Sequence, residues 1–143
     1  MADLFEPTEK PLVMVVEDNA VNMRMLNELL MPYYRVRLAT NAEQAQKGAL
    51  QDPKPDAILL DIVMPRMDGY QLCSWLKNDP ATAEIPVIFL TAKTQIEDAQ
   101  RGFDLGCADY ITKPIMPPVV LARVKTHIAL KRAREFMKGK SWI

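Results

Sequence analysis

Hydrophobic residues along this chain form five short runs, each about as long as a β-strand. Three runs are continuously apolar, as in strands that are buried on both faces of a parallel sheet: residues 12–16, 57–60 and 87–90. Residues 34–38 instead alternate with arginines, which is typical of a half-exposed edge strand. Residues 108–111 are the weakest candidate, because Asp109 indicates one solvated face.

Between these runs, apolar residues recur at the spacing of α-helices. Val21, Met25 and Leu29 form the first such stripe. Three more segments follow the same pattern: 70–76, 96–103 and 119–128. The last stripe thins beyond Leu130, so we expect the final turns of that helix to leave the core.

Local signals mark several helix ends. Thr40 with Glu43, and Thr94 with Glu97, fit the capping box that satisfies free amides at a helix start. Gly106 follows the stripe at 96–103 and predicts its C-terminal stop.

Strict alternation of strands and helices with short connections predicts right-handed crossovers and a parallel sheet. The length of 143 residues is typical of one domain. We therefore predict a single doubly wound α/β fold, in which helices cover both faces of a five-stranded parallel sheet.

Composition excludes several classes. Hydrophobic residues make up 49% and charged residues 25%, as in ordinary globular proteins. No apolar run approaches the roughly 18 residues of a membrane span, and the acidic N-terminus lacks the pattern of a secretory signal. Cys73 and Cys107 are too few for a disulfide framework or a zinc cage. We expect a cytoplasmic protein with two reduced thiols.

The net charge of zero hides an uneven distribution. Residues 119–143 contain seven basic residues and one acidic residue, which gives +6 and leaves −6 on residues 1–118. A basic tail can bind nucleic acid, but it is more often the solvated face of a terminal helix.

The informative polar residues are those that end the apolar runs. Glu17 and Asp18 follow the first run, and Asp61 follows the second buried run. Thr91 follows the third, and Lys113 follows the weak fifth run. The carboxyl ends of parallel strands share one edge of the sheet, where open α/β sheets bind ligands, so we expect these side chains to converge.

Each of these residues also has a purely structural explanation. Asp18 or Asn19 can cap the first helix, and Asp61 and Thr91 can end a strand in a turn. Lys113 can be an ordinary surface lysine. Their position at the same end of different strands favours a shared site.

The charges at this edge favour a divalent cation. Glu17, Asp18 and Asp61 carry −3 and Lys113 carries +1, which leaves −2. Mg²⁺ suits this set, because it binds one or two carboxylates, keeps several waters and leaves room for a phosphate oxygen. The motifs contain no histidine or cysteine, the ligands that zinc favours.

The same residues suit phosphoryl transfer. Aspartate is a known nucleophile that forms an acyl phosphate, and the transfer requires mainly positioning and charge neutralisation. The cation and Lys113 can supply that neutralisation, and Thr91 can hydrogen-bond the new phosphoryl oxygens.

Four motifs resemble those of a known family. They are VVEDN at 15–19, LLDIVMPRMDG at 59–69, LTA at 90–92 and YITKP at 110–114. In this order and spacing they closely resemble the receiver domain of two-component response regulators, over residues 11–130. The resemblance implies a flavodoxin-like fold with strand order 2-1-3-4-5.

By this resemblance Asp61 is the phosphoacceptor. Asp18 and Asp61 would bind Mg²⁺ directly, and Glu17 would act through a water molecule. The backbone carbonyl of Val63 would be the last of the ligands that the protein supplies to the metal.

The resemblance also implies a conformational switch. Lys113 would pair with the phosphoryl group, held by a cis peptide before Pro114. Thr91 and Tyr110 match the family's switch pair, in which the aromatic ring turns inward as the hydroxyl engages the phosphate. The alternative for Tyr110 is an ordinary aromatic residue of an edge strand.

The sequence therefore predicts a regulatory phosphoacceptor rather than an enzyme. A sensor histidine kinase or a histidine phosphotransfer protein would phosphorylate Asp61 in a Mg²⁺-dependent reaction. The added charge would bias the fourth helix, fifth strand and fifth helix, whose surface would bind a partner or a second copy.

The expected layout is an N-terminal extension at 1–10, the receiver at 11–130 and a basic tail at 131–143. The tail would extend the last helix and link it to an output domain. Residues 120–131 resemble the last helix of receivers joined to cyclic-dinucleotide enzymes. A DNA-binding output is the competitor, although this chain contains no helix-turn-helix pattern.

Other functions fit less well. Aspartate-nucleophile phosphatases need a second acid two residues after the nucleophile, where this chain has Val63. A flavin or nucleotide module needs a glycine-rich loop after the first strand, where this chain has Glu17 and Asp18. His127 is expected to be a solvated or flanking residue of the last helix rather than a phosphorylated histidine.

Overall fold

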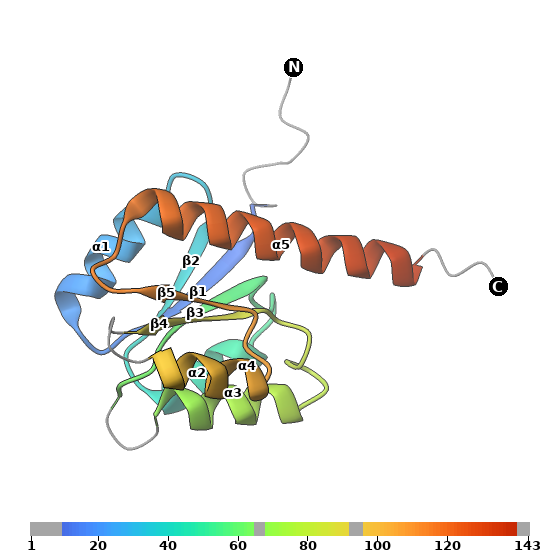
Figure 1. Ribbon diagram of the computed structural model, residues 1–143. Helices are drawn as coiled ribbons and strands as arrows, with labels where there is room; N and C mark the ends of the chain where they lie inside the picture. Colours follow the sequence, from blue (N-terminus) through green and yellow to red (C-terminus); the bar gives the residue numbers. More distant parts are fainter. Residues whose placement is uncertain (1–9, 65–67, 92–95, 140–143) are drawn as a thin grey trace.

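Strands and helices alternate along the chain in the computed structural model, which describes residues 10–64, 68–91 and 96–139 (Figure 1). The strands are β1 Leu12–Val16, β2 Arg35–Ala39, β3 Ala57–Asp61, β4 Val87–Thr91 and β5 Asp109–Thr112. The helices are α1 Ala20–Leu30, α2 Ala42–Leu50, α3 Gly69–Asn78, α4 Ile96–Asp104 and α5 Pro117–Gly139. Within the described ranges, no helix is long and apolar enough to span a bilayer.

The five strands form one parallel sheet in the order β2-β1-β3-β4-β5, which confirms the expected topology. The strand order reverses between β1 and β3, the point at which such sheets bind ligands. β1, β3 and β4 are buried along their whole length, as their apolar runs predict, and β2 is a half-exposed edge.

Helices cover both faces of the sheet (Figure 1). On one face, residues of α1 and α5 pack against the odd-numbered positions of β1, such as Val13 and Val15. On the other face, residues of α2 and α3 pack against Met14 and Val16. The alternation of side chains along each strand thus divides the core into two layers.

Of the three residues in the sequence stripe of α1, Leu29 packs against the core, but Val21 and Met25 do not. Leu26 and Leu30 are fully buried, whereas Val21 is 75% exposed and Met25 is 36% exposed. Both rows have helical spacing, so spacing alone does not tell which one faces the sheet. Val21 and Met25 instead form an exposed apolar strip.

The start of α2 also differs from the prediction. Asn41, not Thr40, is the N-cap, and its side chain accepts a hydrogen bond from the Gln44 N–H at 2.8 Å. The Gln44 side chain reaches back to the backbone N–H of Thr40. Glu43 pairs with Lys47 on the helix surface. The second predicted box, Thr94 with Glu97, lies outside the side chains that the structure describes.

Gly106 ends α4 as predicted. Its φ of 99° lies in the left-handed region that glycine adopts without strain. The Cys107 N–H donates to the Gly102 carbonyl and the Gly106 N–H to the Phe103 carbonyl, both at 3.0 Å. This pair of bonds is the Schellman arrangement that satisfies the last carbonyls of a helix.

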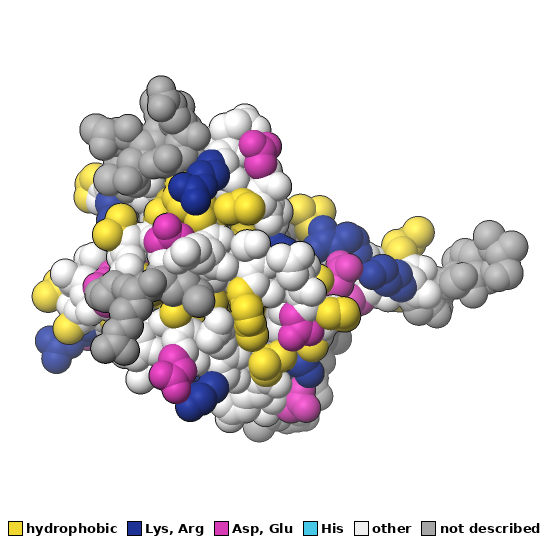
Figure 2. Space-filling model, turned by 90° about the horizontal axis from the view of Figure 1, so that it is seen from below, with side chains coloured by type: hydrophobic (Ala, Val, Ile, Leu, Met, Phe, Trp, Pro, Cys, Tyr) yellow, Lys and Arg dark blue, Asp and Glu magenta, His cyan; other side chains and the backbone are white. Residues whose placement is uncertain are grey.

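α5 begins at Pro117, two residues before the predicted start, because proline is tolerated in the first turn. Val120, Val124 and Ile128 are buried against the sheet. The distal turns project beyond the body, as the thinning stripe predicts, and carry Lys or Arg and hydrophobic side chains (Figures 1 and 2). His127 binds the Asp109 carboxylate at 2.9 Å and so joins α5 to β5.

Candidate functional site

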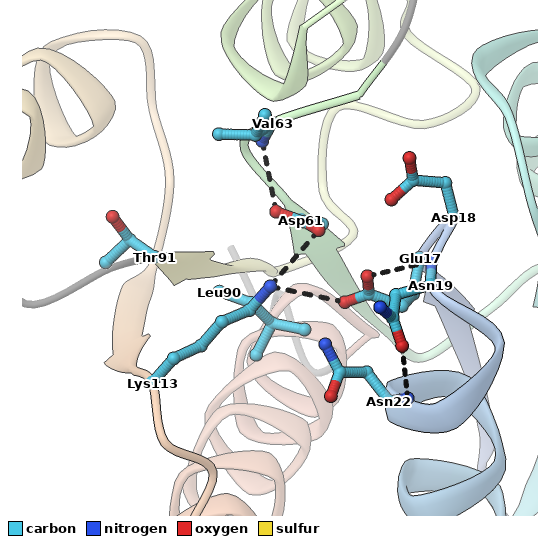
Figure 3. Close-up of a pocket in the computed structure, with 9 residues that line it drawn as sticks. All are labelled: Glu17, Asp18, Asn19, Asn22, Asp61, Val63, Leu90, Thr91 and Lys113. Atoms are coloured by element: carbon cyan, nitrogen blue, oxygen red, sulfur yellow. Dashed lines mark hydrogen bonds and ion pairs between the residues drawn. The ribbon is translucent and has the colours of Figure 1, made fainter.

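Three carboxylates meet at the carboxyl edge of the sheet (Figure 3). Glu17, Asp18 and Asp61 each place one oxygen within 4.8 Å of the other two. Glu17 directly follows β1, and Asp61 is the last residue of β3, so the neighbouring strands bring them together. Glu17 and Asp61 are buried, and Asp18 is exposed. The convergence expected from the strand ends is therefore present.

Glu17 is fully buried and only partly hydrogen-bonded. Its Oε1 accepts the backbone N–H of Asn19 at 3.2 Å. Its Oε2 has no hydrogen-bond partner among the described residues and lies 3.6 Å from the Lys113 ammonium. Burial, with the adjacent Asp61 carboxyl, raises the pKa of Glu17 to about 7, although the Asn19 N–H and Lys113 oppose the shift.

Lys113 is the cation of the cluster. Its Nζ donates to Asp61 Oδ2 at 3.2 Å, in addition to its ion pair with Glu17. The Lys113 N–H donates to the Thr91 carbonyl at 2.7 Å, which fixes the residue beside the end of β4. The peptide bond between Lys113 and Pro114 is cis, as the family resemblance implies.

Asp61 is held by the loop that follows β3. Its Oδ1 accepts the backbone N–H of Val63 at 3.0 Å. The Gly69 N–H donates to the Ile62 carbonyl at 2.7 Å, so the start of α3 packs directly on the end of β3. A Cβ at Gly69 would lie 2.6 Å from Ile62 Cα and 2.7 Å from the Asp61 carbonyl oxygen. Only glycine allows this approach.

The cluster opens into a cavity of about 280 Å³. The predicted residues Glu17, Asp18, Asp61, Val63, Thr91 and Lys113 all line it, together with Asn19, Asn22 and Leu90 (Figure 3). Asn22 is the polar residue that the strand-end argument missed, because it belongs to the first turn of α1. The signal that locates it is its spacing, three residues after the N-cap Asn19.

The predicted switch residues lie on one face of the sheet. Thr91 is buried in the pocket wall. Tyr110 does not line the pocket. It pairs in register with Phe89, which lies two residues before Thr91 on β4. Residues two apart on a strand share a face, so the side chains of Tyr110 and Thr91 point to the same face of the sheet. The Tyr110 ring packs edge-on against Phe103 of α4, with ring centres 5.6 Å apart. Tyr110 therefore connects β5 to α4.

The donor set fits a hard divalent cation. Three carboxylates within reach of one another are only partly neutralised by Lys113. The Oε2 of Glu17 belongs to a fully buried side chain that lines the pocket, and it has no hydrogen bond to any described residue. An unsatisfied buried oxygen is costly, and a hydrated cation would satisfy it. All these ligands are oxygens, which Mg²⁺ and Ca²⁺ prefer.

Comparisons with known proteins agree on one family. The family model described as the response regulator receiver domain matches residues 13–125. A protein of Vibrio cholerae serotype O1 named "Probable cyclic di-GMP phosphodiesterase" is 40% identical over 137 residues. That match covers 96% of this chain but 30% of the relative, so the chain spans less than a third of its length.

Solved structures give the same result. The receiver domain of a histidine kinase from Syntrophus aciditrophicus is 35% identical, with a TM-score of 0.75, over 83% of this chain and 90% of that one. The receiver domain of the sensor histidine kinase PA1611 from Pseudomonas aeruginosa PAO1 is 29% identical, with a TM-score of 0.75. The match covers 83% of this chain and 98% of that one, whose structure holds a magnesium ion in the active-site cleft.

Proposed function

Because the chain belongs to the response regulator receiver domain family, we propose that Asp61 is its phosphoacceptor. The observation that carries this proposal is the surroundings of the Asp61 carboxylate. It lies buried in the pocket, 3.2 Å from the Lys113 ammonium and within 4.8 Å of two further acids. Receiver domains are regulatory and are phosphorylated by histidine kinases, so this chain would accept a phosphoryl group without turning over a substrate.

The proposed transfer forms one bond and breaks one. An Asp61 oxygen attacks the phosphorus of a phosphohistidine, the donor's N–P bond breaks, and the leaving imidazole nitrogen keeps the electron pair and takes a proton from solvent. Mg²⁺ would neutralise charge on the phosphoryl oxygens. Asp18 and Asp61 would hold it directly, Glu17 through water, and Val63 through its carbonyl. Lys113 would then pair with the phosphoryl group.

The proposed switch runs through Thr91 and Tyr110. A phosphoryl group on Asp61 adds charge to which the Thr91 hydroxyl can donate a hydrogen bond. Movement of Thr91 would open space for Tyr110 to turn inward. This turn would remove the Tyr110 ring from Phe103, which is 42% exposed, and would change the surface shared by α4, β5 and α5. That surface is our proposed site for a partner or for a second copy.

A mass measurement tests the acceptor assignment. The chain is treated with acetyl phosphate and Mg²⁺, and intact mass spectrometry reports one added phosphoryl group. We expect Asp61→Asn to take up none, Asp18→Asn to react more slowly and to need more Mg²⁺, and the control Asp79→Asn, outside the pocket, to match the wild type. Phosphorylation of Asp61→Asn would overturn the assignment.

The exposed strip of α1 supports a docking role for the phosphodonor protein. Val21 and Met25 flank Asn22, which lines the pocket, so an apolar surface adjoins the acceptor. We expect Val21→Lys to slow transfer from autophosphorylated histidine kinases while leaving the reaction with acetyl phosphate unchanged. Leu50→Lys, on the opposite helical layer at 41% exposure, is the matched control. Equal slowing with acetyl phosphate would contradict a docking role.

The layout proposed for the chain is an extension at 1–10, a receiver at 11–130 and a tail at 131–143 that leads to an output. A cyclic-dinucleotide enzyme is the favoured output, because the Vibrio cholerae relative matches all but about six residues of this chain and therefore the distal part of α5. A DNA-binding output is less supported, since Lys131 and Lys138 of the basic tail form ion pairs within the chain.

A cytoplasmic location belongs to the same proposal. Cys73 and Cys107 are free thiols and buried. Burial raises the pKa of Cys73 to about 11 and that of Cys107 to about 12, so both stay protonated and unreactive at neutral pH. Unpaired thiols are usual in the reducing cytoplasm.

A further inference from the structure

Asn22 presents an unused carboxamide to the pocket. Its backbone N–H donates to the Asn19 side chain at 2.9 Å and so completes the N-cap of α1. Its side chain is half-buried and points into the cavity from below Glu17 (Figure 3). Among the described residues, this carboxamide has no hydrogen-bond partner.

The corresponding residues of α2 and α3 behave differently. Each helix has a side chain at its third position that can reach back toward the cap. Gln44 of α2 accepts from the Thr40 N–H at 2.8 Å, and Gln71 of α3 accepts from the Asp68 N–H at 3.1 Å. In α1 the third position holds Asn22, which is one methylene shorter, and the Asn19 N–H is taken by Glu17 instead. In α1, Glu17 thus accepts the N–H that the third helical residue accepts in α2 and α3. The Asn22 carboxamide is therefore available to a ligand in the cavity.

The chemistry of a hydrated cation supplies a partner for this carboxamide. Mg²⁺ keeps several of its waters when it binds to a protein. A water that coordinates a cation through its oxygen has two hydrogens to donate and therefore needs two acceptors. The Oε2 of Glu17, which accepts no hydrogen bond from the described residues, is one acceptor in this pocket. The carboxamide of Asn22 lines the same cavity, with its nitrogen on the side of Glu17 (Figure 3). A half-turn of the carboxamide exchanges nitrogen and oxygen, and its oxygen is then the second acceptor.

We propose that Asn22 is a positioning residue of the cation site. Its carboxamide oxygen accepts a hydrogen bond from the cation-bound water that also donates to Glu17. This inference rests on the proposed function, because it requires a hydrated cation among Glu17, Asp18 and Asp61. Groups that orient a metal's ligands typically change metal affinity by about 10-fold to 100-fold when they are mutated.

Calorimetric titration of the unphosphorylated full chain with MgCl₂ tests the proposal. We expect Asn22→Ala to raise the dissociation constant about tenfold. Asn22→Asp keeps an acceptor oxygen and adds charge, so it should bind Mg²⁺ at least as tightly as the wild type. Asn27→Ala, the same substitution on the same helix but outside the pocket, should leave the affinity unchanged. The melting temperature without metal should be the same for the wild type and Asn22→Ala.

The outcomes separate this proposal from the function on which it rests. Failure of the wild type to bind Mg²⁺ would overturn both. If the wild type binds Mg²⁺ and Asn22→Ala binds it equally well, only the role of Asn22 is wrong. Equal Mg²⁺ affinity with an altered lifetime of the aspartyl phosphate would also overturn it, because the carboxamide would then act on the phosphoryl group. If Asn27→Ala lost as much Mg²⁺ affinity as Asn22→Ala, the loss would come from a less stable helix, and the role of Asn22 would be wrong.

Discussion

Glu17 shows how one buried side chain links the fold to its ligand. Its pKa of about 7 in the folded chain lies well above the ordinary value of 4.5. The folded chain therefore holds this proton more tightly than the unfolded chain, and the stabilising effect of protonation is lost as pH rises from about 4.5 to about 7. A cation and this proton neutralise the same cluster, so they compete.

The pH dependence of stability tests this linkage. Without divalent cations, we expect the melting temperature of the wild type to fall relative to that of Glu17→Gln between about pH 5 and pH 8. MgCl₂ should reverse much of this fall at pH 8 and have little effect at pH 5, where the proton occupies Glu17. Calorimetric melting curves measure both effects. Parallel curves for the two proteins would show that Glu17 titrates alike in the folded and unfolded chain.

At the scale of single elements, apolar runs predict strands better than stripes predict helix faces. β1, β3 and β4 have both faces covered, so every residue in their runs is buried and no choice of face arises. α1 offers two apolar rows, and only packing selects Leu26 and Leu30. The same difference holds for the site. The positions of the residues at strand ends follow from the parallel sheet, but the position of Asn22 depends on how the turn after β1 directs α1.

Paired substitutions on α1 test the corrected face. Leu26→Ala removes a fully buried side chain and should cost about 2–5 kcal/mol of unfolding free energy. Val21→Ala, at a position that is 75% exposed, should change stability by less than about 0.5 kcal/mol. Urea denaturation measures both. Comparable losses for the two variants would mean that the apolar stripe of Val21 faces the core after all.

The junction of β3 and α3 makes a second prediction at this scale. Gly69→Ala should destabilise by about 1–3 kcal/mol, because its Cβ would meet the backbone of Ile62 and Asp61 at 2.6 and 2.7 Å. It should also slow phosphorylation, since the clash displaces the end of β3. Gly48→Ala is the control, because its nearest contact is the flexible Met14 side chain at 2.8 Å. Equal destabilisation of both variants in urea would contradict the role assigned to Gly69.

At the scale of the whole molecule, α5 consists of two parts with different surroundings. Its first half buries Val120, Val124 and Ile128 in the core. Lys131 then makes an ion pair with Asp56 at 3.5 Å, and both side chains are mostly buried. Asp56 in turn accepts the backbone N–H of Leu12 at 2.8 Å. Past this point the helix meets the body through exposed contacts such as Lys138 with Glu84 at 3.6 Å. Burial along α5 thus falls off near Lys131, where we propose that the receiver ends.

Shortening the helix tests this division. A chain that ends at residue 133 keeps the Lys131–Asp56 ion pair. It loses the ion pairs of Glu135 and Lys138 and the 62% exposed Phe136 side chain, which we expect to contribute about 1 kcal/mol or less together. We expect it to lose no more than that in urea denaturation and to react with acetyl phosphate at the rate of the full chain. Lys131→Ala in the full chain should cost more than the truncation, since it leaves the mostly buried Asp56 carboxylate without its cation. A truncated chain that is several kcal/mol less stable, or that is phosphorylated more slowly, would contradict this division and make the removed turns of α5 part of the receiver.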